Sequence, residues 1–206
     1  MFKEHELIIP LEVSHLQRVE YGDKVYLSGI MFTARPAWYR RVLDLGRDLP
    51  VDLKKLGANV LLHAGPVVRR VPATREWEVV AIVPMPDWIA DGSDGNVAKI
   101  IKKVGLRAVI GKGKLKKAKE IFGDNQCLHL ITIGTWNNFA RRIKRVNRVE
   151  WLDLGLTEAM WFFEVERMGP FIVETDIKGQ SLYERIRAEQ DTKISEVLER
   201  RGLANL

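Results

Sequence analysis

Apolar positions along the chain follow two periods. Short apolar and β-branched runs bounded by turn formers predict strands. These runs lie at residues 6–13, 24–30, 59–63, 77–83, 107–110, 127–133, 148–154, 161–165 and 171–175. Apolar residues three or four positions apart predict helices instead. Such spacing occurs at residues 37–45, 97–104, 114–122, 135–145 and 181–206.

The order of these elements indicates the fold class. Between residues 97 and 145 strands and helices alternate, which is typical of a parallel sheet with helical crossovers. The strand-rich ends favour a second, antiparallel layer. Residues 65–77 hold two prolines and three arginines, and we expect this segment to include a surface loop. Residues 84–96 are rich in turn formers. We therefore predict an α/β protein with mixed sheets.

Composition limits the possible cofactors and compartments. The 206 residues fit one domain, and the single cysteine, Cys127, excludes an internal disulfide and favours the cytoplasm. An iron–sulfur cluster is usually held by several thiolates, so a cluster would have to come from another chain. His5, His15, His63 and His129 lack metal-ligand spacing, so we expect neutral core or surface histidines and no metal. The start of the chain predicts no signal peptide, and no apolar run is long enough to span a membrane.

The positive charge of the chain raises the question of its partners. The formal net charge is +6 and the pI about 9.5, which invites a nucleic-acid hypothesis. Basic residues are spread along the chain, however, and those at 141–148 fall on more than one face of the expected helix. An anionic small substrate or an acidic partner subunit explains the charge equally well, so we do not favour nucleic acid.

Two predicted strand ends carry a cation. Ligands of open parallel sheets bind beyond the carboxyl ends of the strands. After the strand at 24–30, Gly29 allows close backbone approach, Thr33 offers a hydroxyl and Arg35 offers a fork suited to a carboxylate. An arginine at the start of a helix can also be purely structural or solvated.

The second cation follows the strand at 107–110. Gly111 and Gly113 free the backbone to turn, Lys112 adds a positive charge, and the helix start behind them presents N–H groups to an anion. The alternative is an ordinary loop. We predict a carboxylate-binding site at Gly29, Thr33, Arg35, Gly111, Lys112 and Gly113.

Several collinear motifs resemble one enzyme family. They are residues 22–29, 32–35, 64–66, 110–113, 154–155, 158–161 and 179–183. Together they resemble the C-terminal domain of class I fumarases and the β subunit of L(+)-tartrate dehydratases. The resemblance covers about residues 6–183.

This resemblance implies a fold and a function. The fold is a swivelling β/β/α three-layer domain over residues 1–183, with a central mostly parallel sheet and a second antiparallel sheet. A helical extension at residues 184–206 is expected to pack on it. The domain would close over a 4Fe-4S cluster held by a partner α subunit, with the chain forming a hetero-oligomer, a homodimer or both. The family's arginine and lysine bind substrate carboxylates and fall on Arg35 and Lys112, while cluster iron acts as a Lewis acid.

The chain also departs from the family pattern. Pro36 replaces an aspartate, Tyr39 replaces a histidine, and residues 87–95 lack the family's threonine pair and arginine. An acidic loop there would repel a dicarboxylate. Three hypotheses follow: a substrate with fewer carboxylates, proton transfer by Asp91 or Ser93, or lost catalysis. We therefore expect a hydro-lyase subunit, and the alternative is a binding or regulatory module of the same fold.

Overall fold

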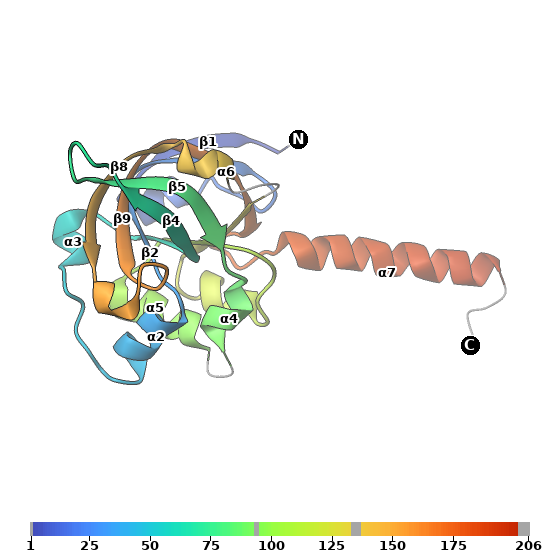
Figure 1. Ribbon diagram of the computed structural model, residues 1–206. Coiled ribbons are helices and arrows are strands. Elements are labelled where there is room, and N and C mark those ends of the chain that lie inside the picture. Colours follow the sequence, from blue (N-terminus) through green and yellow to red (C-terminus); the bar gives the residue numbers. More distant parts are fainter. Residues whose placement is uncertain (1, 93–94, 133–136, 202–206) are drawn as a thin grey trace.

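The computed structural model describes residues 2–92, 95–132 and 137–201, with Ser93 outside the described residues. Figure 1 shows a compact body from which one long helix extends. The body is built around a seven-stranded sheet. In sheet order its strands are β1 (Glu4–Ile8), β2 (Lys24–Thr33), β3 (Val60–Leu62), β6 (Ala108–Gly111), β7 (Leu128–Thr132), β9 (Met160–Thr175) and β8 (Ile143–Glu150).

The central sheet is mostly parallel, as predicted, and it closes on itself. Strands β1, β2, β3, β6 and β7 pair in parallel, whereas β9 runs antiparallel to β2, β7 and β8. Because β9 pairs with both β2 and β7, the strands β2, β3, β6, β7 and β9 form a closed, barrel-like sheet. We predicted two separate strands at 161–165 and 171–175, but β9 is one strand of 16 residues, and this length allows the closure.

A second, antiparallel sheet lies against the barrel, as expected. It consists of β4 (Ala64–Arg70) and β5 (Trp77–Pro84). Trp77 packs edge-on against Trp161 of β9, with ring centroids 5.3 Å apart. Residues 65–77 include a surface loop, as expected, because β4 ends at Arg70 and β5 begins at Trp77, and residues 71–76 connect them.

Helices surround the sheet, and the two longer helices of the body pack against the face away from β4 and β5. The longer ones are α2 (Pro36–Leu43) and α5 (Asn96–Val104), both predicted, with Pro36 in the first turn. The short ones are α1 (Val13–Leu16), α3 (Leu53–Leu56), α4 (Asp87–Asp91), α6 (Asn137–Ala140), the π-helical turn η1 (Lys119–Gly123) and the 3-10 turn η2 (Leu152–Leu154).

Two predicted helices are wrong in extent. The one at 114–122 is reduced to the turn η1. In the described part of 135–145 only α6 is helical, and β8 begins at Ile143. The free edge of β9 offers β8 a hydrogen-bonded partner, so tertiary pairing overrides the local preference for helix.

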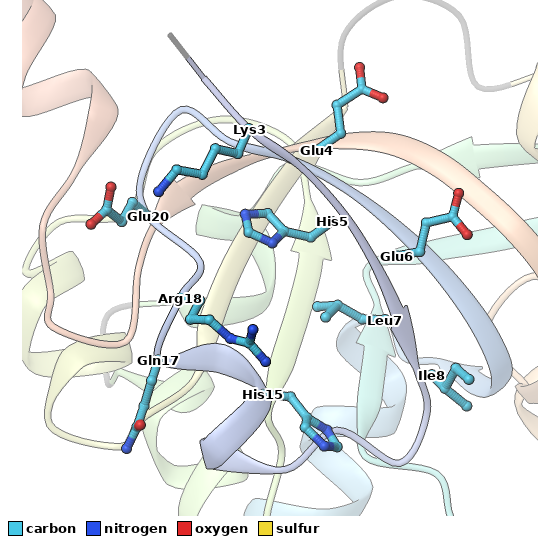
Figure 2. A pocket seen from close by; sticks show the side chains of 10 residues that line it. All are labelled: Lys3, Glu4, His5, Glu6, Leu7, Ile8, His15, Gln17, Arg18 and Glu20. Atoms are coloured by element: carbon cyan, nitrogen blue, oxygen red, sulfur yellow. The ribbon is translucent and has the colours of Figure 1, made fainter.

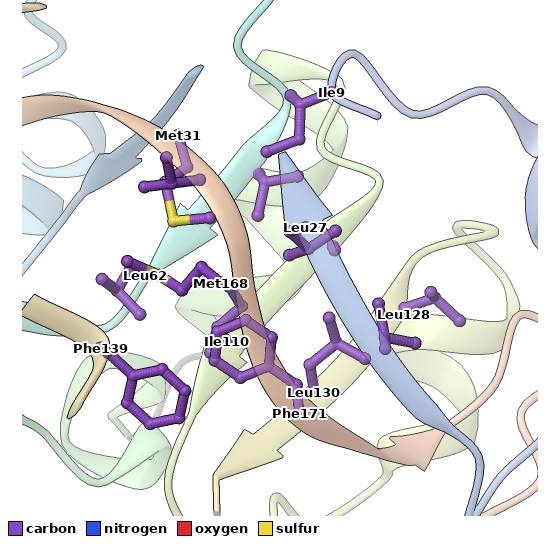
Figure 3. Close-up of a cluster of buried hydrophobic side chains, with 14 of the residues drawn as sticks. Ile9, Leu27, Met31, Leu62, Ile110, Leu128, Leu130, Phe139, Met168 and Phe171 are labelled. Carbon is purple, nitrogen blue, oxygen red and sulfur yellow. The ribbon is translucent and has the colours of Figure 1, made fainter. Parts of the chain in front are cut away.

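The apolar core lies on both faces of the sheet. Figure 3 shows Leu27, Met31, Ile110 and Leu130 gathered beside Phe171 in the cluster on the barrel side. A second buried cluster joins the opposite face to the helices. Its largest members are Trp38, Phe32, Phe162 and Phe122. These two clusters hold the strand ends in fixed register.

The last described helix, α7 (Leu182–Arg200), runs away from the body (Figure 1). Ser181 caps it by accepting a hydrogen bond from the amide of Glu184, yet none of the helical residues is buried. The packing of the extension on the body and the division of the chain at residue 183 both stay predictions. Across the described residues, no helix combines the length and apolar character that a membrane crossing requires.

Removal of residues 187–206 is expected to leave the body folded. Because α7 buries none of its residues, the free energy of unfolding should change by less than about 0.5 kcal/mol. A urea titration followed by circular dichroism measures this change. A loss of several kcal/mol would mean that the extension stabilises the body.

Candidate active site

The predicted cations lie at one edge of the central sheet. In the register of neighbouring strands, Thr33 of β2 pairs with Leu62 of β3, and Leu62 pairs with Ile110 of β6. Arg35 lies two residues after Thr33, and Lys112 lies two residues after Ile110. Strands lie about 4.8 Å apart, so β2 and β6 are about 10 Å apart on either side of β3. The fold thus brings the two predicted cations to the same edge.

Arg35 does not present its whole charge to solvent. Its Nε donates to Oε1 of Glu158 at 2.8 Å, and the amide of Ala37 donates to Oε2 of the same carboxylate at 3.0 Å. Glu158 thereby anchors both the guanidinium and the first turn of α2, and both side chains are partly exposed. This ion pair weakens the attraction of Arg35 for a second anion.

Two of the predicted residues have a structural explanation. Thr33 is buried, and its hydroxyl donates to the carbonyl of Ala159 and accepts from the amide of Trp161. A side chain at Gly29, whose φ is +122°, would meet the carbonyl of Ile9 at 2.7 Å. Their contact with substrate stays a prediction.

The turn after β6 has a carboxylate beside it. A Cβ atom at Gly111 would lie 1.6 Å from Oδ1 of Asp87, and the role of Gly111 in substrate binding stays a prediction. The gap beside Gly111 thus holds a carboxylate of the chain itself. Gly113, with φ of +96°, has open space around it, and Lys112 is exposed. Lys112 is therefore the predicted cation that faces solvent.

Of the two candidate proton-transfer residues, Asp91 lies in the described part of the chain. Asp91 ends α4, is half-buried, and accepts a hydrogen bond from the amide of Val97 at 3.0 Å, which fixes it at the start of α5. Burial raises the pKa of Asp91, and the charge of Asp87 adds to this effect, although His63 opposes it. Ser93 lies outside the described residues.

A buried cluster behind this edge was missed by sequence reasoning. Asp87 is fully buried and accepts hydrogen bonds on both oxygens. Nδ1 of His63 lies 2.5 Å from Oδ1, and Nε2 of His129 lies 3.0 Å from Oδ2. On the far side of His63, Nε2 lies 2.6 Å from the hydroxyl of Tyr39, which can donate to it.

His129 is held between two carboxylates. Its Nδ1 lies 2.9 Å from Oε2 of Glu174, and its ring stacks on Phe122 with centroids 4.6 Å apart. Since both ring nitrogens face carboxylate oxygens, both must donate, and His129 is an imidazolium. The neutral state that we predicted for His129 is therefore wrong, although its satisfied burial is confirmed.

The protonation of this cluster follows from its charges. Burial alone would lower the pKa of His129, but the charges and hydrogen bonds of Asp87 and Glu174 outweigh it and raise the pKa to about 9. Burial likewise opposes ionisation of both carboxyls. The charge and hydrogen bonds of His129 nevertheless hold the pKa of Asp87 and of Glu174 below the ordinary value, and the hydroxyls of Ser181 and Thr175 donate to Glu174.

One sequence signal could have indicated the cluster. His129 and Glu174 stand inside apolar strands, and His63 directly follows one. Buried polar side chains almost always find partners, so two histidines among apolar strands should be matched with carboxylates. The sequence does not show which carboxylate pairs with which histidine. That pairing depends on the register of β7 against β9 and on the contact of the Asp87 segment with the end of β6.

A separate surface hollow lies elsewhere on the body. Figure 2 shows the side chains of His5, Leu7, His15 and Arg18 around it, from β1 and from the segment before β2. This hollow runs along the edge strand β1, whereas ligands of parallel sheets bind beyond the carboxyl ends of the strands. We do not assign it to the candidate site. Within the described part of the chain, no group of three His, Cys, Asp or Glu residues is placed to hold a metal ion.

The structure is thus an α/β fold with the two predicted cations at one edge of a mostly parallel sheet. Comparison with known proteins gives its family. The model of the family "Fumarase C-terminus" matches residues 4–186, and the chain belongs to this family.

Named relatives agree with this family. The L(+)-tartrate dehydratase subunit beta of Escherichia coli strain K12 is 30% identical over 178 residues, which cover 85% of each protein. A Methanocaldococcus jannaschii protein, named provisionally as the same subunit, is 32% identical over 189 residues, or 89% of this chain and 93% of that protein. A Geobacillus stearothermophilus protein, named provisionally as a class I fumarate hydratase, is 31% identical over 192 residues. These cover 92% of this chain and 35% of that protein.

Proposed function

We propose that the chain is the β-type subunit of an iron–sulfur-dependent hydro-lyase that dehydrates a hydroxy acid. The observation that carries the proposal is the placement of Arg35 and Lys112 at one edge of the sheet, in a member of the fumarase C-terminus family. In this proposal residues 1–183 form a swivelling domain that closes over the partner α subunit, and residues 184–206 extend from it.

The cluster in this proposal belongs to the partner. The chain has one cysteine, Cys127, which is buried directly before β7. This burial raises the pKa of its thiol. Such a thiol is a poor ligand, and cluster binding usually needs several thiolates. The residues of this chain do not fit a 4Fe-4S cluster, so the proposal places the cluster on the α subunit.

The chain's own residues would bind and orient the substrate. Lys112 is exposed beside Gly113 and would hold a carboxylate as a point charge. Arg35 would contribute less, because Glu158 already shares its guanidinium. This balance favours an organic acid with fewer carboxylates than a typical dicarboxylate substrate. Asp91 and Ser93 remain the proposed candidates for proton transfer.

One alternative has an observation in its favour. The gap at Gly111 is filled by Asp87, and Arg35 is paired with Glu158, so carboxylates of the chain itself already lie beside two of the predicted substrate-binding residues. A binding or regulatory module that kept the fold and lost the chemistry would tolerate such an arrangement.

Affinity purification from the native cells, under oxygen exclusion, tests the proposal. We expect a brown, cysteine-rich α subunit to copurify in a fixed ratio, and the purified complex to dehydrate a hydroxy acid. A complex that contains the cluster protein but dehydrates no hydroxy acid would favour the regulatory alternative. A colourless protein without a partner would contradict the proposal.

A further inference from the structure

Asp87 and the proline before it hold the Lys112 turn. The amide of Asp87 donates to the carbonyl of Lys112 at 3.1 Å, and Pro86 forms a parallel β-bridge with Lys112. The carboxylate of Asp87 occupies the gap that the missing side chain of Gly111 leaves open. The main chain and the side chain of one residue therefore hold the turn that carries the exposed lysine.

The carboxylate of Asp87 has a fixed orientation. Each oxygen is bound by a different histidine, so the group cannot rotate without breaking a buried hydrogen bond. The histidines are held in turn at their far nitrogens, His63 by Tyr39 of α2 and His129 by Glu174 of β9. The position of Asp87 is thus determined by β7, β9, α2 and the junction between β3 and β4.

We propose that Asp87 is a positioning residue for Lys112, and that His63 and His129 act on Lys112 through it. The inference rests on the proposed function, in which Lys112 binds the substrate carboxylate. Asp87 itself is fully buried and would not contact the substrate. The cluster would instead fix the direction from which the lysine approaches.

An ionised carboxylate suits this role better than its amide. Asp87 accepts from ring nitrogens on both sides, and an asparagine has only one acceptor oxygen. Its NH₂ group would face a ring N–H that also donates. His63 must then either lose this contact or move its ring proton to Nε2 and donate to the Tyr39 hydroxyl. In both cases a neutral amide replaces the charge that binds His129 and holds the side chain beside Gly111.

The test compares Asp87→Asn with His63→Gln, which does not touch Lys112. In each isolated, folded variant, hydrogen exchange measured by NMR at the amide of residue 87 reports its bond to the Lys112 carbonyl. We expect exchange to be roughly tenfold faster than in the wild type. Asp23→Asn is the matched control, since Asp23 is a buried carboxylate paired with His5 at the opposite end of the strands, and it should leave this exchange unchanged.

The same variants are assayed in the complex with the α subunit, with L(+)-tartrate as the first substrate tried and other hydroxy acids after it. A misplaced lysine should raise KM roughly 10- to 100-fold with kcat nearly unchanged. Wild-type exchange at residue 87 and wild-type KM in both variants would overturn the inference. If Asp87→Asn does not fold, His63→Gln decides alone. If the wild-type complex dehydrates nothing, the proposed function fails, and the exchange measurement still decides whether the cluster holds the Lys112 turn.

Discussion

Replacement of His129 with alanine is expected to lower the free energy of unfolding by about 3–5 kcal/mol, because it leaves buried charge uncompensated. His129 is the only imidazolium between Asp87 and Glu174 in the described cluster, and all three side chains are fully buried. Without it, two carboxylates face each other in the core, and Phe122 loses its stacking partner. A urea titration of the isolated chain, followed by circular dichroism, measures the loss.

His5→Ala provides the matched control. His5 also pairs with a carboxylate, that of Asp23, but its side chain is partly exposed. Asp23 is buried, but without His5 it keeps the hydrogen bonds that it accepts from the amides of Lys3 and Glu20, so we expect a loss of about 1 kcal/mol or less. Similar losses in the two variants would contradict the charged, buried cluster described above.

The same cluster makes stability depend on pH. The pKa of His129 is raised from 6.5 to about 9, so its stabilisation is complete below pH 6.5 and is lost as the pH rises to about 9. The amount lost is about 3 kcal/mol at most. Asp87 and Glu174 have lowered pKa values, so their contribution is lost at acid pH instead. The wild type should therefore lose stability between pH 6.5 and 9, and His129→Ala should not.

The second large effect is expected on activity. In the complex with the α subunit, Lys112→Ala should lower kcat/KM roughly 10- to 100-fold, because the variant loses a charged hydrogen bond to the substrate carboxylate. Lys112 is exposed and forms no ion pair with any described residue, so the folded chain should keep its stability. Steady-state dehydration rates and a urea titration together separate these two effects.

Lys114→Ala is the control for Lys112. Lys114 stands two residues further along, is exposed, and pairs with Glu184 at 3.6 Å. It should leave kcat/KM unchanged. Arg35→Ala should also lower kcat/KM, but less than Lys112→Ala, because Glu158 already neutralises part of the guanidinium charge. Wild-type rates in both Arg35→Ala and Lys112→Ala would refute the assignment of the site.

The sequence predicted those parts of the fold that depend on local pattern. Helix α5 and strand β2 were found because their periods are regular and their ends carry turn formers. Strand β8 is predicted only in part: its end lies in the strand expected at 148–154, whereas residues 143–145 are expected to be helical and become strand through pairing with β9. Closure of the barrel is not predictable either, because the single strand β9 must pair with both β2 and β7. Ile172 of β9, for example, pairs with Lys24 and with Ile131, which are far apart in the sequence.

The site was predictable in a similar way. Arg35 and Lys112 were found because each follows a strand, and parallel strands bring their carboxyl ends together. Glu158 was not found as the partner of Arg35, because it lies 123 residues away. Asp87 was seen only as a departure from the family pattern, and its place beside Gly111 depends on a bridge between Pro86 and Lys112.

The most direct test of whether the chain is a hydro-lyase subunit is a comparison of two rates. The dehydration of hydroxy acids by the cluster-bearing α subunit is measured once with this chain and once without it. We predict that the α subunit alone is inactive, that the complex dehydrates at least one hydroxy acid, and that Lys112→Ala removes most of that rate. An equal rate without the chain, or no dehydration by the assembled complex, would contradict this function.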